Sequence, residues 1–230
     1  MNGGLVVVEG NIGAGKSTFA QILAKALDGE YLPEPADGTS PYLADYYRDP
    51  ARWAFEMQMF LLTRRYRAQK YAQSKVRHRG CGFVVMDRSY YGDVCFANVQ
   101  RELGYFSQRD YDTYLHHHAD MKVNLEPPAM AIFLNASVEV CKARIDKRLS
   151  EKAGRQCESG ISLDYLWLLE HEIHALADIL EGKTIIKQFP WGDDKTVDEI
   201  RYLCEALAQD IVGRKESVYD FWTGTDGIGA

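Results

Sequence analysis

The segment LVVVEGNIGAGKST, residues Leu5–Thr18, decides the fold of this chain. It joins an apolar run to the pattern G-x-x-x-x-G-K-S, which spans Gly10–Ser17. Glycines let the backbone N–H groups of such a loop curl around phosphate oxygens, while the lysine reaches the terminal phosphates and the serine hydroxyl ligates Mg²⁺. A helix that begins after the loop adds the partial positive charge of its N-terminus. The segment therefore predicts a binding site for a nucleoside triphosphate such as ATP, formed by Gly10, Asn11, Ile12, Gly13, Ala14, Gly15, Lys16, Ser17 and Thr18.

The composition favours one globular domain. The chain has 230 residues, of which 46% are hydrophobic, so it can bury one sizeable core and is short for two. We expect a single domain over residues 1–212 and a Gly-rich C-terminal tail over residues 213–230. The net charge of -6 disfavours a surface that wraps nucleic acid, because such binding depends on neutralising phosphates. Nucleic acid is therefore not an expected partner.

Neither membrane insertion nor a disulfide framework is expected. The chain has no apolar run near the roughly 18 residues that span a bilayer, and its first residues lack the basic start of a signal peptide. Its five cysteines are scattered without a C-x-x-C pair, which argues against disulfides and a zinc site. The run His116–His118 is also a poor metal site, because adjacent side chains on a helix point about 100° apart. We expect a soluble, cytoplasmic protein.

Apolar runs alternate with segments long enough for helices. Strands are expected at Leu5–Glu9, Phe83–Asp87, Ala129–Leu134 and Thr184–Gln188, with a short one near Tyr31. Helices are expected after the phosphate loop and at Arg52–Lys75 behind Pro50, Val138–Leu149, Leu163–Leu180 and Val197–Val212. This alternation predicts an α/β fold with a parallel sheet of about five strands flanked by helices.

Polar residues follow the predicted strands, where ligands of open α/β sheets bind. Glu9 precedes the loop, Glu34 lies between two prolines, and Asp87-Arg88 ends a strand. The stiff backbone around Glu34 suits a carboxylate that takes a proton from a hydroxyl. Asp87 could hold Mg²⁺, and Arg88 could neutralise phosphate or orient the base. The alternatives are an ordinary loop acid and a surface ion pair.

An arginine-rich lid is a further expectation. Arg144 and Arg148 are four residues apart and so share one helix face, and Arg155 follows in the polar loop Ser150–Gly160. Phosphoryl transfer needs donors that close over the transferred group and exclude water. The alternative is a solvated helix face on which these arginines pair with nearby acids.

Together these segments resemble the deoxynucleoside kinase family, which includes deoxycytidine, deoxyguanosine and deoxyadenosine kinases. The resemblance covers roughly residues 5–180 and rests on EGNIGAGKST, PEP, DPARWAFEMQ, DRSYYGD, RIDKR and GRQCESGISLDYL. It implies a P-loop kinase fold and ATP-dependent phosphorylation of a deoxynucleoside 5′-hydroxyl. It also implies a homodimer formed by long helices, including the one behind Pro50.

The resemblance implies a role for each matching residue. Glu34 would be the general base, positioned by Arg88; Lys16 would bind phosphates, with Ser17 and Asp87 serving Mg²⁺. The lid arginines Arg144, Arg148 and Arg155 would close over the phosphoryl group. The nucleoside would contact Tyr47 and Glu158 at its sugar and Met57, Gln58, Arg65 and Asp93 at its base.

Arg65 and Asp93 match the Arg/Asp pair of family members that accept deoxycytidine or purine deoxynucleosides, where thymidine-preferring members carry small or apolar residues. A carboxylate accepts from an exocyclic amino group, and thymine has no donor at that position, so thymidine is disfavoured. The segment Ser40–Gln69 also looks closer to bacterial-type deoxyadenosine and deoxyguanosine kinases, which favours a purine deoxynucleoside. Two departures stand out: the spacing from Arg148 to Arg155 is longer than is typical, and Gly38 follows the PEP motif where some members have a bulkier residue.

Two other functions remain open. A nucleoside monophosphate kinase resembling thymidylate kinase shares the loop and the Asp-Arg pair, but its acceptor needs extra arginines where this chain has Glu34. A catalytically silent kinase-like subunit is the other, and the presence of Lys16, Glu34 and Arg88 argues against it.

Overall fold

A computed structural model describes residues 3–34, 40–78, 82–151, 160–192 and 194–213. Its five strands are β1 (Gly4–Gly10), β2 (Glu30–Leu32), β3 (Phe83–Asp87), β4 (Met130–Asn135) and β5 (Ile185–Pro190). They form one sheet in the order β2-β3-β1-β4-β5, and every neighbouring pair is parallel. This confirms the predicted sheet. β4 and β5 each begin one residue later than expected and also end later.

The helices are α1 (Lys16–Ala26), α2 (Leu43–Arg48), α3 (Pro50–His78), α4 (Asp93–Glu102), α5 (Gln108–Lys122), α6 (Val138–Glu151), α7 (Leu163–Leu180) and α8 (Val197–Gly213). The helix behind Pro50 continues past the expected end at Lys75. The predicted tail is described only at Gly213, and the departure at Gly38 lies outside the described residues.

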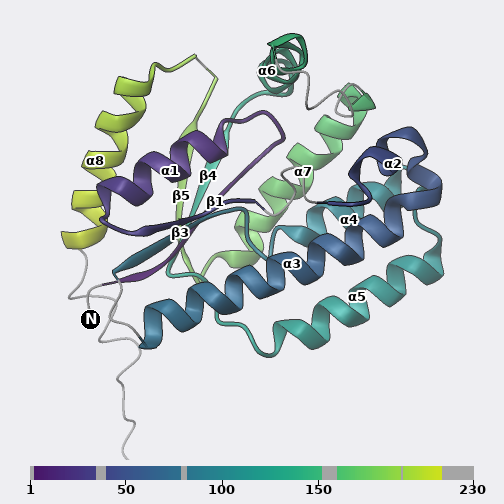
Figure 1. Cartoon of the computed structure of the whole chain (residues 1–230), viewed down its shortest axis with the longest axis horizontal. Coiled ribbons are helices and arrows are strands. Elements are labelled where there is room, and N and C mark those ends of the chain that lie inside the picture. Colours follow the sequence, from purple (N-terminus) through teal and green to yellow (C-terminus); the bar gives the residue numbers. More distant parts are fainter. Residues whose placement is uncertain (1–2, 35–39, 79–81, 152–159, 193, 214–230) are drawn as a thin grey trace, which may run out of the picture.

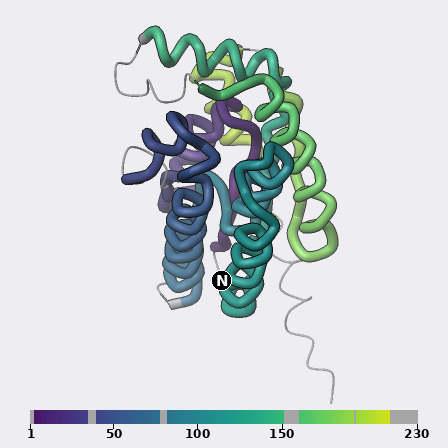
Figure 2. The backbone as a smooth tube through the Cα atoms, turned by 90° about the vertical axis from the view of Figure 1, so that its right-hand side faces the viewer, coloured from purple at the N-terminus to yellow at the C-terminus, as the bar shows by residue number. Residues whose placement is uncertain are grey.

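The sheet lies between two layers of helices (Figure 1). One face packs against α1 and α8, and the other against α3, α4 and α7. In Figure 2, α3 in blue runs beside the teal helices α4 and α5. No helix in the described part of the chain is long and apolar enough to cross a membrane.

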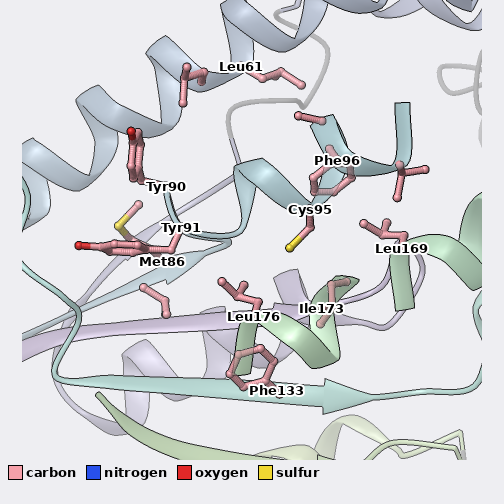
Figure 3. Packing of buried hydrophobic residues seen from close by; sticks show 14 of the residues in the cluster. Leu61, Met86, Tyr90, Tyr91, Cys95, Phe96, Phe133, Leu169, Ile173 and Leu176 are labelled. Carbon is pink, nitrogen blue, oxygen red and sulfur yellow. The ribbon is translucent and has the colours of Figure 1, made fainter. Parts of the chain in front are cut away.

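Successive side chains of β1 point to opposite faces of the sheet and therefore enter two different hydrophobic cores. Val6 and Val8 belong to the cluster beneath α1 and α8, whereas Leu5 and Val7 belong to the opposite cluster. Figure 3 shows that second cluster, in which side chains of α3, α4 and α7 meet above the sheet. The alternation continues to Glu9, which is completely buried. A carboxylate thus stands at the end of the apolar core, beside the phosphate loop.

The three consecutive histidines lie on α5. His116 and His117 are exposed, while the ring of His118 stacks on Tyr90 with 4.5 Å between the ring centroids. The described residues contain no group of three or more potential ligands that could hold a metal ion.

Candidate active site

The phosphate loop has the backbone geometry that its glycines allow. Gly13 and Gly15 have φ angles of 85° and 91°, in the left-handed region that other residues rarely adopt. A Cβ atom at Gly13 would lie 2.5 Å from the carbonyl oxygen of Cys141 on α6, so this position requires glycine. α1 begins at Lys16, directly behind the loop. The loop is therefore shaped to present its N–H groups and the N-terminus of α1 to an anion.

Two side chains fix the loop from within. The Asn11 amide donates to the carbonyl oxygen of Leu166 on α7 at 2.9 Å and accepts from the Ile12 N–H at 2.8 Å. Lys16 Nζ donates to the Asn11 carbonyl oxygen at 2.8 Å. Burial, followed by the charge of Arg88, lowers the pKa of Lys16 to about 8. The ammonium group is thus held inside the loop, next to where phosphates would bind.

An oxygen-rich corner lies beside the loop. The Ser17 hydroxyl, at the start of α1, donates to Asp87 Oδ2 at 2.5 Å. Asp87 is buried, and its other oxygen, Oδ1, has no hydrogen-bond partner among the described residues. Burial raises the pKa of this carboxyl, although the charge of Lys16 opposes the change. A hydroxyl and a carboxylate with a spare oxygen fit Mg²⁺, which prefers oxygen ligands.

Glu34, directly behind β2, lies between two arginines. Its Oε1 accepts from Arg65 Nη2 of α3 at 2.7 Å and lies 2.9 Å from Arg88 Nε behind β3. Burial by itself would raise the pKa of Glu34, but the charges of Arg88, Arg65 and Lys16 together lower it to about 2. The side chain remains 19% exposed. An ionised carboxylate therefore lies at the carboxyl ends of the parallel strands, where the phosphate loop also lies.

Arg88 connects this carboxylate to the phosphate loop. Its Nη1 donates to the carbonyl oxygen of Gly10 at 3.0 Å, and its guanidinium lies over the Phe96 ring. Arg88 has a φ of 65°, in the left-handed region that non-glycine residues seldom adopt. Backbone strain of this kind often accompanies functional sites.

A buried polar network lies behind Glu34. The Asp93 carboxylate, at the start of α4, accepts from Arg65, from Gln58 Nε2 at 2.8 Å and from the Tyr114 hydroxyl at 2.6 Å. The side-chain amide oxygen of Gln58, Oε1, accepts from Gln100 Nε2 at 2.8 Å. Asp93 is fully buried, so a direct contact between its carboxylate and a base would require the surrounding side chains to move. The structure thus brings Gln58, Arg65 and Asp93 together, while their contact with a base remains a prediction.

Of the remaining predicted nucleoside contacts, the structure describes Met57 and Tyr47. Met57, next to Gln58 on α3, is almost fully buried. Tyr47, at the end of α2, borders a small cavity of about 30 Å³ that Tyr46, Tyr105 and Tyr165 also line. Glu158, the expected partner of Tyr47 at the sugar, lies outside the described residues.

The lid arginines are described only in part. Arg144 on α6 contacts Asp194 Oδ1 at 3.2 Å and donates to the carbonyl oxygen of Ala14, in the phosphate loop, at 3.5 Å. Arg148 follows one turn later and is partly buried. Arg155 lies outside the described residues. Arg144 thus contacts the loop, and closure of a lid remains a prediction.

Sequence reasoning assigned no role to several residues that support the site. Trp191, directly behind β5, is buried, and its ring meets that of Phe19 edge to face at 5.4 Å. Its indole nitrogen would lie 3.4 Å from a Cβ atom at Gly15, so it packs against the loop. Tyr114 and Gln100 complete the network around Asp93 and Gln58. Trp191 could have been found from its position at a strand end, but nothing local to Tyr114 or Gln100 signals their partners.

Comparisons with known proteins point to one enzyme family. A family model described as deoxynucleoside kinase matches residues 6–192. A deoxyadenosine kinase of Dictyostelium discoideum is 30% identical over 207 residues, which cover 90% of this chain and 80% of that protein. A deoxyadenosine/deoxycytidine kinase of Bacillus subtilis is 35% identical over 164 residues, 70% of each chain.

A solved structure is similar over nearly its whole length. The deoxyadenosine kinase of M. mycoides with the products dCMP and a flexible dCDP superposes with a TM-score of 0.71 at 26% identity, over 88% of this chain and 98% of that one. The family match runs from β1 through the phosphate loop, the Glu34 carboxylate and the Asp87-Arg88 turn to Trp191. This chain belongs to the deoxynucleoside kinase family.

Proposed function

We propose that this enzyme transfers the terminal phosphoryl group of ATP to the 5′-hydroxyl of a deoxynucleoside, with a preference for purine deoxynucleosides. The observation that carries the proposal is the double contact of Arg88, which lies 2.9 Å from Glu34 and 3.0 Å from the Gly10 carbonyl oxygen. A carboxylate that can receive a proton is thereby connected to a loop that can hold a triphosphate. The arrangement has a donor side and an acceptor side.

Glu34 acts as the acceptor-side base. With a pKa of about 2 it is ionised at neutral pH and can accept a hydrogen bond from the 5′-hydroxyl. Such a low pKa makes a weak base, yet a loose phosphoryl-transfer transition state demands little deprotonation until the new bond has formed. Glu34 therefore orients the hydroxyl first and receives its proton late.

The residues around the phosphate loop neutralise the negative charge of the ATP phosphates. Lys16 and the N–H groups of the loop bind the phosphates, and Arg144, which already contacts the loop, moves with Arg148 and Arg155 to the transferred group. When Mg²⁺ is bound, it withdraws charge from the phosphate oxygens. Ser17 and the spare oxygen of Asp87 would hold this ion.

We infer that Gln58 reads the acceptor base after a rearrangement that frees its fully buried amide from Asp93 and Gln100. Because Asp93 can only accept, it holds the Gln58 Nε2 toward itself and so fixes the orientation of the amide. Tyr47 and Glu158 grip the sugar, and Met57 packs against the base. The Dictyostelium relative named deoxyadenosine kinase supports a purine substrate, and the product dCMP bound to the M. mycoides enzyme supports deoxycytidine as a further substrate. Thymidine, without an exocyclic amino group, is the poorest substrate.

A monophosphate acceptor fits less well. Its phosphate would need arginines without a carboxylate partner, whereas Arg65 and Arg88 both contact Glu34. The Glu34 charge would repel a second anion. We therefore favour an uncharged hydroxyl as the acceptor.

We also propose that the enzyme is a cytoplasmic homodimer assembled through long helices, including α3. Leu163 and Trp167 lie one turn apart on α7 and are 48% and 51% exposed, which adds apolar surface for such an interface. The buried free thiols Cys95, Cys141 and Cys204 suit a reducing compartment. Light scattering should give twice the protomer mass of 26.1 kDa; a monomer at micromolar concentration would contradict the dimer.

The replacement Glu34→Gln tests the catalytic proposal. It keeps the size of the side chain and removes the base, so kcat should fall by roughly 10²–10⁴ while the nucleoside Kd stays within a few-fold. Glu205→Gln, an exposed carboxylate on α8, is the matched control and should keep wild-type kcat. Near wild-type turnover by Glu34→Gln would remove Glu34 as the base.

A further inference from the structure

Glu9 is a buried carboxylate for which the proposed chemistry has no use. It is the last residue before Gly10, and none of its surface is exposed. Burying a carboxylate costs free energy unless it is well partnered, and here burial raises the pKa of Glu9. An apolar residue would continue the pattern of Leu5 and Val7 at lower cost. A function for the Glu9 carboxylate should therefore be visible in its contacts.

Those contacts lie in the turn behind β3. Glu9 Oε1 accepts from both the N–H of Ser89 at 2.8 Å and its hydroxyl at 2.7 Å. The Ser89 hydroxyl oxygen in turn accepts from the N–H of Gly92 at 3.0 Å. A Cβ atom at Gly92 would lie 2.7 Å from Oε1 and 2.8 Å from Oε2, so the backbone closes directly over the carboxylate. The turn from Ser89 to Gly92 is thus built around Glu9.

Arg88 is the residue whose position this arrangement determines. It precedes Ser89 and has the disfavoured φ of 65°. Its N–H donates to the carbonyl oxygen of Val8 at 3.0 Å, and its guanidinium donates to that of Gly10 at 3.0 Å. In the sequence Glu9 lies between Val8 and Gly10, which supply these two acceptors, and its carboxylate binds Ser89, the residue after Arg88. Three consecutive residues of β1 therefore fix Arg88 relative to the phosphate loop.

We propose that Glu9 is a positioning residue: its carboxylate holds the Arg88–Ser89 turn so that the Arg88 guanidinium keeps Glu34 aligned with the phosphate loop. This inference rests on the proposed role of Glu34 as the base. Glu9 does not touch a reacting atom, since its oxygens contact Ser89 and reach only to 3.9 Å from Arg88 Nη1. It acts on catalysis through Arg88.

The test compares Glu9→Ala and Glu9→Gln with the control Val7→Ala. Misplacing a catalytic group by about 1 Å costs on the order of 100-fold in rate, so Glu9→Ala should lower kcat by about 10- to 100-fold and leave both KM values within about threefold. Glu9→Gln keeps an acceptor for Ser89 and should recover to within about fivefold of wild type. Val7→Ala removes buried volume from the same strand and should lower the melting temperature without changing kcat.

A double-mutant cycle separates positioning from general destabilisation. In a Glu34→Gln background, Glu9→Ala should lower kcat less than about threefold, because the group that Arg88 positions is already lost. An equal loss in both backgrounds, or a matching kcat loss in Val7→Ala, would overturn the inference. If Glu9→Ala fails to fold, Ser89→Ala, which removes one of the two hydrogen bonds, should still lower kcat several-fold; unchanged kcat would overturn it.

The two proposals fail differently. Near wild-type kcat in Glu34→Gln would refute the base itself. A large loss in Glu34→Gln together with wild-type kcat in Glu9→Ala would refute only the positioning role.

Discussion

Replacing Arg65 with methionine should destabilise the fold far more than a typical single substitution. Arg65 is 2% exposed and lies between Glu34 and Asp93, which is fully buried. Methionine occupies similar space but supplies no charge, so Asp93 would be left with hydrogen bonds from Gln58 and Tyr114 and no cation. Breaking a buried ion pair by removing one partner costs about 3–5 kcal/mol. That is a large share of the roughly 5–15 kcal/mol by which domains are stable.

The loss in the free energy of unfolding should be smaller when the unpaired charge of Asp93 is removed as well. Asp93→Asn keeps the shape of the side chain, so the double variant Arg65→Met/Asp93→Asn leaves no uncompensated charge at that position. We expect it to be less destabilised than the sum of the single variants by about 2 kcal/mol. Urea unfolding followed by tryptophan fluorescence measures all three free energies. A loss below 1 kcal/mol for Arg65→Met, or costs that simply add, would refute the buried network.

Two further predictions concern the same network. The double variant Asp93→Ala/Arg65→Met should raise kcat/KM for thymidine relative to kcat/KM for deoxyadenosine, because Gln58 would lose the carboxylate that fixes its amide. An unchanged ranking of the four deoxynucleosides would contradict this role of the network. The second prediction concerns pH. The pKa of Glu34 is about 2 in the folded protein and 4.5 in the unfolded chain. The ionised carboxylate therefore contributes about 3 kcal/mol to the free energy of unfolding above pH 4.5, and this contribution is lost as the pH falls toward 2. The difference in unfolding free energy between wild type and Glu34→Gln should therefore narrow below pH 4.5, and a constant or widening difference would contradict the assignment.

The phosphate loop and the sheet were predictable because their signals are local. The glycine spacing of Gly10–Ser17 and the apolar runs on either side specify a strand, a turn and a helix without reference to the rest of the chain. Glu34 and Arg88 followed from the rule that ligands bind at the carboxyl ends of parallel strands. Their contact in the structure agrees with that rule.

The polar network was predictable only in part. α5 was not assigned, because its sequence QRDYDTYLHHHADMK is too polar to show a clear apolar face. A local signal was nevertheless present: Ser107 and Asp110 form a capping box at its start. The partnership of Tyr114 with Asp93 joins two helices whose residues are 21 positions apart, and no periodicity encodes such a contact.

Glu9 illustrates a second limit of prediction from the sequence. Because Glu9 follows an apolar run, it was expected among the polar residues at the strand ends that could meet a ligand. In the structure its carboxylate is buried and accepts two hydrogen bonds from Ser89. Whether a polar residue at a strand end faces a ligand or supports a neighbouring turn depends on the backbone that packs above it. Here that backbone belongs to Gly92, which lies in a different part of the sequence.

The central claim is that the acceptor is the 5′-hydroxyl of a deoxynucleoside and the donor is ATP. A coupled ADP-release assay across the four deoxynucleosides and their four monophosphates tests it directly. We predict turnover with deoxyadenosine, deoxyguanosine and deoxycytidine, weaker turnover with thymidine, and none with any monophosphate. Turnover restricted to the monophosphates would contradict the account.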